Sequence, residues 1–127
     1  MTVTKELALQ EAWDEMDVEA SQGAFLSRLA ALCNASMESK GFNDQLAHFP
    51  TDVALMHSEL SEALEAHRKD LPSEKIPGFR GIEEELADLL YRILHVSIKH
   101  RIRLEAAFFA KARYNLSRPP MHGGKKY

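Results

Sequence analysis

The most hydrophobic stretch of the chain is "GIEEELADLLYRILHVSIKHR", residues 81–101, and it decides the fold class. Its apolar residues recur at helical spacing and cover well over half of a helix circumference. A helix of this kind packs on several sides at once, so the stretch predicts a central helix of a bundle. The apolar positions are Ile82, Leu86, Leu89, Leu90, Ile93, Leu94, Val96 and Ile98, and the narrow polar stripe holds Glu84, Glu85, Asp88, Arg92, His95 and Lys99.

A second helix is predicted upstream, where residues 57–67 read "HSELSEALEAH". Apolar residues at helical spacing alternate there with charged ones, which is typical of an amphipathic helix. Thr51 or Asp52 can cap its start, and we expect it to run to about Asp70. The connector "LPSEKIPGF", residues 71–79, then interrupts the helix with two prolines and a glycine.

The remaining sequence also favours helices. Residues 1–40 form an N-terminal helical block that ends at Gly41, and Pro50 closes the connector that follows it. A last helix is predicted over residues 104–117, and no run alternates with the period of a strand. Helices of this length with short connectors favour an up-and-down bundle.

The sequence therefore predicts one all-α domain over residues 1–127. Its four-helix-bundle-like core lies in the motif-bearing helices of residues 51–118, preceded by the N-terminal helical extension and followed by a basic tail over residues 119–127. A chain of 127 residues suits one domain with a modest core.

Composition narrows the function classes. The net charge is -3, so no overall basic field points to nucleic acid, and the basic C-terminal tail fits a solvated or phosphate-facing segment. No apolar run approaches the roughly 20 residues of a membrane span. Cys33 is the single cysteine, which excludes an internal disulfide and fits a small buried residue in a reducing compartment. We expect a cytoplasmic protein that binds neither membranes nor specific nucleic acid sequences.

Two pairs of acids stand out against this background. Glu59 and Glu62 are three residues apart, as are Glu85 and Asp88, so each pair shares one helical face. Glu59 also lies inside an apolar arc, where a lone carboxylate is costly unless a cation meets it. If the two helices pack antiparallel, both pairs converge on one site, and divalent cations would relieve the repulsion. Glu59 falls between Leu55, Met56, Leu60 and Leu64.

The types of ligand atom indicate which metal ion the acids would bind. Carboxylate oxygens without thiolates suit Mg²⁺, with Mn²⁺ as a substitute, better than Zn²⁺. A di-iron site of the usual bundle type needs Glu-x-x-His, and no histidine here lies three residues after a glutamate. The alternative is that the acids are ordinary solvated charges. Arg92 and Lys99 fit charge partners of the acids as well as they fit phosphate ligands.

These residues resemble the MazG-like all-α nucleoside triphosphate pyrophosphohydrolases. The segments that carry the resemblance are "SELSEALEAHRKD", "EEELADLLYRIL" and "KARYNLSRPPMHGGKKY", within residues 41–127. The family signature is Glu-x-x-Glu followed by Glu-x-x-Asp, and Lys-x-x-x-Asn-x-x-Arg-Pro in the final helix adds specificity. One position departs from it, because Ser58 stands where the family commonly has a second glutamate. The matching positions are Glu59, Glu62, Glu85, Asp88, Lys111, Asn115 and Arg118.

The resemblance implies Mg²⁺-dependent hydrolysis of a nucleoside triphosphate between the α and β phosphates, with release of a monophosphate and pyrophosphate. It implies that Glu59, Glu62, Glu85 and Asp88 hold the metal and form the catalytic centre, with an outer acid such as Glu84 as a further candidate for orienting water. Lys111, Asn115 and Arg118 would then bind the substrate phosphates. A homodimer or homotetramer is the expected assembly.

A second reading stays open from the sequence. A non-catalytic helical bundle could keep this fold and bind a partner protein or a nucleotide. Such a bundle would tolerate alanine at all four acid positions, because removing charges that repel one another helps a metal-free structure. The base and the sugar of the substrate are not identified by the sequence.

Overall fold

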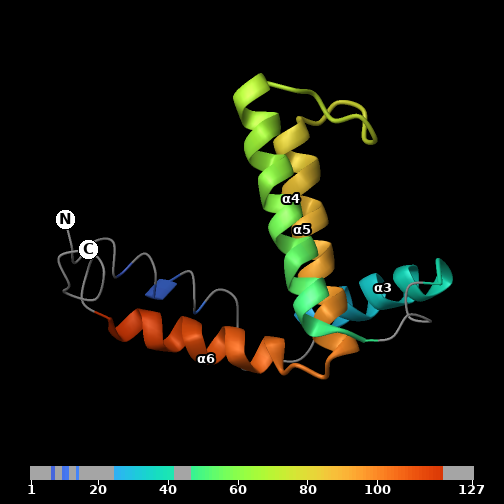
Figure 1. Ribbon diagram of the computed structural model, residues 1–127. Coiled ribbons are helices and arrows are strands. Elements are labelled where there is room, and N and C mark those ends of the chain that lie inside the picture. Colours follow the sequence, from blue (N-terminus) through green and yellow to red (C-terminus); the bar gives the residue numbers. More distant parts are fainter. Residues whose placement is uncertain (1–6, 8–9, 12–13, 15–24, 42–46, 119–127) are drawn as a thin grey trace. The chain divides into compact units, whose positions relative to one another are not determined.

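The computed structural model describes residues 7, 10–11, 14, 25–41 and 47–118 (Figure 1). The described part is all-α, and its helices pack against each other as in a helical bundle, so the predicted fold class is confirmed. Its β structure is limited to one isolated antiparallel bridge between Pro72 and Arg80. With the labels of Figure 1, the helices are α3 (Phe25–Ser39), α4 (Phe49–Lys69), α5 (Gly81–Lys99) and α6 (Leu104–Ser117).

The chain divides into two compact units, which are described separately. Arg28–Ile102 is one unit and contains most of α3 with all of α4 and α5, whereas α6 belongs to the other. The single domain predicted over residues 1–127 stays a prediction. Most of the predicted N-terminal block before residue 25 and the predicted basic tail, residues 119–127, lie outside the described residues.

The core of the larger unit is the α4–α5 hairpin, whose two helices run antiparallel side by side (Figure 1). Small residues allow the close approach at its closed end. A Cβ atom added at Gly81 would lie 3.0 Å from the Cβ of Ala66 and 3.0 Å from the carbonyl oxygen of Leu71. The Gly81 N–H also donates to that carbonyl at 2.8 Å. A side chain at the first residue of α5 would therefore require its neighbours to shift by a few tenths of an ångström.

The predicted start of α4 is wrong by three to four residues. The helix begins at Phe49, and its N-cap is His48 rather than Thr51 or Asp52. Pro50 lies within the first turn instead of closing the connector, because a first-turn residue needs no N–H for the helical ladder. The His48 Nδ1 accepts from the Thr51 N–H at 3.4 Å, which is a long capping bond.

The other helix ends lie close to their predicted positions. Asp70 ends α4 in the left-handed conformation with φ 50°, and its N–H donates to the carbonyls of the last turn. α5 ends at Lys99, two residues earlier than predicted, and Arg101 adopts φ 54° in the turn that follows. α6 has the predicted bounds, 104–117.

The buried apolar side chains are few and mostly small. They include Cys33, as expected from the sequence, and Ala63 and Ala66 of α4. The prediction that α5 packs on several sides is met in its C-terminal half, where the four consecutive residues 94–97 are buried, and not in its N-terminal half. Leucines at four-residue spacing remain about half exposed on both helices, and these are Leu60, Leu64, Leu86 and Leu90.

None of the described helices combines the length and the hydropathy needed to cross a membrane.

Candidate metal centre

Three of the four predicted metal ligands come together between the helices of the hairpin. Glu59 projects from α4, and Glu85 and Asp88 project from successive turns of α5. One carboxylate oxygen from each of the three residues lies within 4.8 Å of the others. Glu59 is buried, with only 7% of its surface exposed, and its two neighbours are half-buried. The antiparallel convergence expected from the sequence is present.

Glu62, the fourth predicted ligand, lies at the edge of this cluster. Its side chain is exposed, and it does not belong to the close group formed by the other three acids. Its carboxylate is nevertheless near enough for its negative charge to raise the pKa of Glu85. The position of Glu62, one turn after Glu59 on α4, places it beside the cluster rather than at its centre.

The acids of the cluster perturb one another's protonation. Burial, together with repulsion from Glu62 and Glu59, raises the pKa of Glu85 from 4.5 to about 7. Burial, together with the charge of Glu59, also raises the pKa of Asp88. Because each negative charge makes its neighbours harder to ionise, a cation at the cluster would stabilise the charged forms of these acids.

One such cation is supplied by the chain itself. The Arg92 Nε lies 2.7 Å from the Glu59 Oε1 across the hairpin, and the Arg92 side chain is 31% exposed. Burial on its own would raise the pKa of Glu59, but the hydrogen bond from Arg92 and its positive charge hold it below the ordinary value. Of the two roles open for Arg92 from the sequence, the structure assigns that of charge partner in the metal-free protein.

The donor set fits a hard divalent cation. The cluster offers carboxylate oxygens only, which suit Mg²⁺ and Mn²⁺. A further acid, Glu84, is buried beside it, and its Oε1 is a buried polar atom without a hydrogen-bond partner among the described residues. A buried carboxylate oxygen in that position indicates a place for a ligand or an ion. The residues present are therefore compatible with the expected metal. Besides the three closest acids, Glu84 also offers a carboxylate oxygen.

Glu84 faces a pocket of about 290 Å³ at the closed end of the hairpin. The pocket is lined by acids of both helices and by the connector between them, from which Lys75 contributes the positive charge. Lys75 is close enough to lower the pKa of Asp88 against the larger effect of burial. The acids that line this pocket are Glu62, Glu65, Glu74, Glu84 and Glu85.

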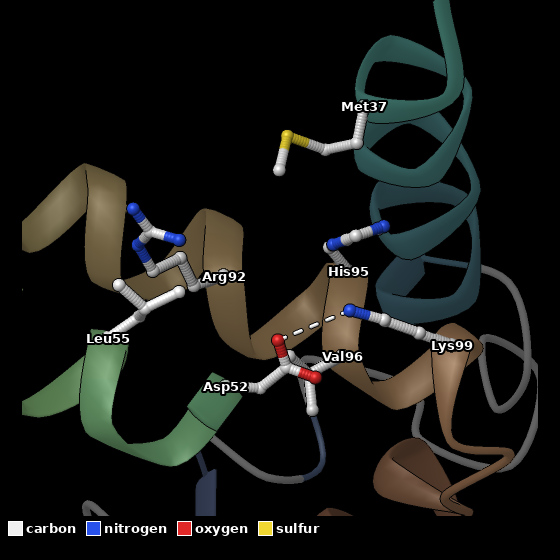
Figure 2. A pocket seen from close by; sticks show the side chains of 7 residues that line it. All are labelled: Met37, Asp52, Leu55, Arg92, His95, Val96 and Lys99. Carbon is white, nitrogen blue, oxygen red and sulfur yellow. Dashed lines mark hydrogen bonds and ion pairs between the residues drawn. The ribbon is translucent and has the colours of Figure 1, made fainter. Parts of the chain in front are cut away.

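A second pocket, of about 230 Å³, lies farther along the hairpin beside α3 (Figure 2). Met37, Leu55 and Val96 supply apolar walls, and the polar lining comes from Asp52, Arg92, His95 and Lys99. His95 is buried, and its burial followed by the charge of Lys99 lowers its pKa, so the imidazole is neutral near pH 7. Arg92 thus lines this pocket and also contacts the acid cluster.

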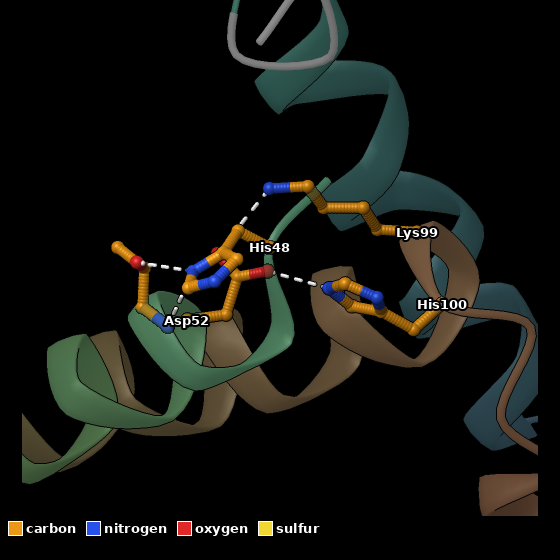
Figure 3. Close-up of polar contacts among 5 residues, drawn as sticks. His48, Asp52, Lys99 and His100 are labelled. Carbon is orange, nitrogen blue, oxygen red and sulfur yellow. Dashed lines mark hydrogen bonds and ion pairs between the residues drawn. The ribbon is translucent and has the colours of Figure 1, made fainter. Parts of the chain in front are cut away.

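A polar network that the sequence analysis missed joins the two helices at the open end of the hairpin (Figure 3). Asp52 accepts from the Lys99 Nζ at 3.2 Å through Oδ1 and lies 2.6 Å from the His100 Nε2 through Oδ2. Burial would raise the pKa of Asp52, but the bonds from His100 and Lys99 hold it below the ordinary value. The sequence contained a signal for this network, because Asp52 is an acid near the start of one helix and Lys99 and His100 are basic residues at the end of the next. In an antiparallel pair these two ends lie side by side.

The predicted phosphate ligands lie on α6 and at its C-terminal end, in the other unit. Lys111, Asn115 and Arg118 are exposed. Lys111 and Asn115 are four residues apart on one side of the helix, whereas Arg118 is the C-cap residue and has an extended backbone. The Lys111 Nζ lies 4.5 Å from the centre of the Tyr114 ring, and the Arg118 guanidinium carbon lies 5.9 Å from it. Both cations therefore stack on Tyr114 in this structure, and their assignment to phosphate stays a prediction.

No protein-family model, curated protein or solved structure matches this chain. The resemblance to the MazG-like enzymes accordingly rests on the motif residues and on the chemistry of the site they form.

Proposed function

We propose that this protein is a Mg²⁺-dependent nucleoside triphosphate pyrophosphohydrolase that cleaves a ribo- or deoxyribonucleoside triphosphate between the α and β phosphates. The observation that carries the proposal is the convergence of Glu59, Glu85 and Asp88 from two antiparallel helices, with carboxylate oxygens within 4.8 Å of one another. Their order and spacing are those of the family that the sequence resembles.

The electrostatics of the site support this function. A triphosphate is strongly anionic and would be repelled by bare carboxylates, so the cluster can accept it only together with cations. When bound, Mg²⁺ supplies charge neutralisation for the phosphates and activation of a water molecule, and Mn²⁺ can substitute. Glu59, Glu85 and Asp88 hold the ion, and Glu62 completes the set from the rim.

The resemblance implies roles for other residues of the chain. Glu84, whose buried Oε1 lacks a partner among the described residues, is suited to orient the attacking water. Lys111 and Arg118 neutralise the outer phosphates, and Asn115 adds a hydrogen bond.

The proposed assembly is a homodimer or a homotetramer. The half-exposed leucines of α4 and α5 support it, because such surface is usually covered in a symmetric interface.

The test is pyrophosphate release by the purified protein with Mg²⁺ and a panel of ribo- and deoxynucleoside triphosphates. We expect release from at least one nucleotide, its loss in EDTA, and a decrease of roughly a hundredfold or more in Glu59→Gln and in Asp88→Asn. Glu83→Gln is the matched control, because it removes an exposed charge of α5 while glutamine keeps the helix cap. Failure of every nucleotide to release pyrophosphate would contradict the proposal.

A second candidate function is a non-catalytic helical module. The ion pair between Arg92 and Glu59 favours it, because a buried carboxylate that already has a partner needs no metal. A module of this kind would lose no function in Glu85→Ala or Asp88→Ala. Its melting temperature would rise in these variants and would not change when Mg²⁺ is added. An enzyme would show a melting temperature that rises with Mg²⁺ and loses this response in both variants.

A further inference from the structure

Arg92 lies between two sites that the chain offers to ligands. On one side its Nε donates to the Glu59 Oε1 at 2.7 Å, within the acid cluster. On the other side Arg92 lines the pocket of about 230 Å³ with His95 and Lys99 (Figure 2). A single guanidinium is therefore within reach of both a metal-binding group and a cavity.

A divalent cation and Arg92 compete for the same carboxylate. An ion held by Glu59, Glu85 and Asp88 would lie close to the guanidinium, and like charges at such distances repel strongly in a partly buried site. The Arg92 side chain is only 31% exposed, so leaving it without a partner would be costly. Metal binding at the cluster would therefore be favoured by a new anionic partner for Arg92.

The pocket contains one acid, and that acid is already engaged. Asp52 uses Oδ1 for Lys99 and Oδ2 for His100, so both of its oxygens have cationic or donor partners. The other lining residues are apolar or carry hydrogen-bond donors. The anion that takes over Arg92 must therefore come with the ligand.

The size of the pocket indicates which part of a ligand it takes. Pockets that hold a whole drug-sized or nucleotide-sized molecule measure roughly 300–1,000 Å³. A volume of about 230 Å³ is below that range and suits one group of such a molecule. A guanidinium forms bidentate hydrogen bonds to phosphate. The small volume and the guanidinium together indicate that the pocket takes a phosphate group next to the metal.

We propose that Arg92 exchanges partners when the site is loaded, releasing Glu59 to the metal and binding a phosphate group of the nucleotide from the side of the pocket. This inference rests on the proposed function, since the phosphate belongs to the metal-bound triphosphate. Arg92 then makes metal binding and nucleotide binding depend on each other. It opposes the metal in the empty site and favours the metal once the nucleotide is present.

The first measurement is a titration of the protein with Mn²⁺ in the absence of nucleotide. The electron paramagnetic resonance signal of free Mn²⁺ reports how much of the ion is bound. Arg92→Met removes the internal competitor and is expected to lower the Mn²⁺ dissociation constant roughly tenfold. Arg92→Lys keeps a positive charge without the planar guanidinium and should fall between Arg92→Met and the wild type, which keeps the test informative if Arg92→Met does not fold. Arg68→Met, an exposed arginine of α4, is the control and should match the wild type.

The second measurement is the binding of a nucleoside triphosphate with a non-hydrolysable α,β-imido linkage, by calorimetry at saturating Mn²⁺. Arg92→Met is expected to bind this analogue roughly tenfold more weakly than the wild type, and Arg68→Met equally well. Opposite effects of one substitution on metal and on nucleotide are the signature of partner exchange. A purely structural role for Arg92 would weaken both.

The outcomes separate this inference from the function on which it rests. Equal or weaker Mn²⁺ binding in Arg92→Met, or unchanged analogue binding, overturns the exchange while wild-type metal binding and turnover stand. A wild-type protein that binds no Mn²⁺ either alone or together with the nucleotide analogue overturns the proposed function and the exchange with it.

Discussion

Arg92 and Glu59 form an ion pair across the α4–α5 hairpin, with 2.7 Å between Nε and Oε1. The pair explains how a carboxylate with 7% of its surface exposed is stabilised without an ion. It also places a positive charge at the point where a divalent cation would bind. The charge of Glu59 can therefore be balanced either by this internal cation or by an external one.

Arg92→Met should destabilise the metal-free protein. The substitution leaves Glu59 buried without its charged donor, and we expect the free energy of unfolding to fall by about 1–3 kcal/mol in EDTA. Saturating Mg²⁺ should recover much of this loss, because the ion takes over the carboxylate. Urea denaturation in both conditions measures the difference, and an equal loss with and without Mg²⁺ would contradict a shared site.

The stability of the metal-free protein should depend on the proton of Glu85. The folded state holds that proton up to about pH 7, whereas the unfolded chain releases it near its ordinary value of 4.5. Because the folded state binds more protons in this window, this contribution to stability is complete below pH 4.5 and is lost as the pH rises through 7. The size of the effect is about 1–3 kcal/mol.

Glu85→Gln tests this pH dependence. The difference in free energy of unfolding between the variant and the wild type should grow from pH 5 to pH 8 in favour of the variant. Taking the difference removes the opposite contribution of His95, whose lowered pKa makes stability rise with pH. A difference that stays constant over this range would show that Glu85 titrates at its ordinary value.

The Asp52 network should hold the open end of the hairpin together. Asp52→Asn leaves Lys99 and His100 with a weaker acceptor, and we expect a loss of about 1–3 kcal/mol in the free energy of unfolding at pH 7. The lowered pKa of Asp52 means that this contribution is present above pH 4 and is lost as the pH falls below it. The exposed pair of Glu65 and Lys69 on α4 provides the control.

Denaturation of Asp52→Asn and Glu65→Gln side by side checks this prediction. Glu65→Gln should have the smaller effect, since exposed pairs within one helix contribute little. Equal losses in the two variants would mean that the network contributes no more than a surface ion pair.

The exposed leucines should mediate self-association. Leu60 and Leu90 are each about half exposed on the hairpin helices, and a charged residue in a symmetric interface is repeated in every copy. Leu60→Lys and Leu90→Lys should therefore reduce the mass measured by light scattering during gel filtration. Ser61→Lys, at an exposed neighbouring position of α4, serves as the control, and an unchanged mass in both leucine variants would exclude these surfaces from the interface.

The inward position of Glu59 could be predicted from sequence because it depends on helical periodicity alone. A glutamate inside an apolar arc, with a second acid pair one helix later, is enough to predict convergence once the helices are antiparallel. The choice of Arg92 as its partner could not be predicted, because it depends on the register between α4 and α5. A shift of one residue would change which side chains face each other across the hairpin.

The same limit explains the network that was missed and the helix start that was misplaced. Asp52 lies 48 residues from His100 along the chain, and only the length of the connector brings them together. Asp52 was also interpreted as an N-cap residue, so its contacts across the hairpin were not predicted. The packing of α5 was overestimated only in its N-terminal half, where Leu86 and Leu90 are about half exposed.

The central claim is that the acid cluster uses a divalent cation to cleave a nucleoside triphosphate between its α and β phosphates. Phosphorus NMR of the products formed from the best nucleotide of the panel, with Mg²⁺ and with EDTA, tests it most directly. We predict monophosphate and pyrophosphate in equal amounts with Mg²⁺, and neither product in EDTA or with Glu59→Gln. Formation of diphosphate and orthophosphate, or products that persist in Glu59→Gln, would contradict the account.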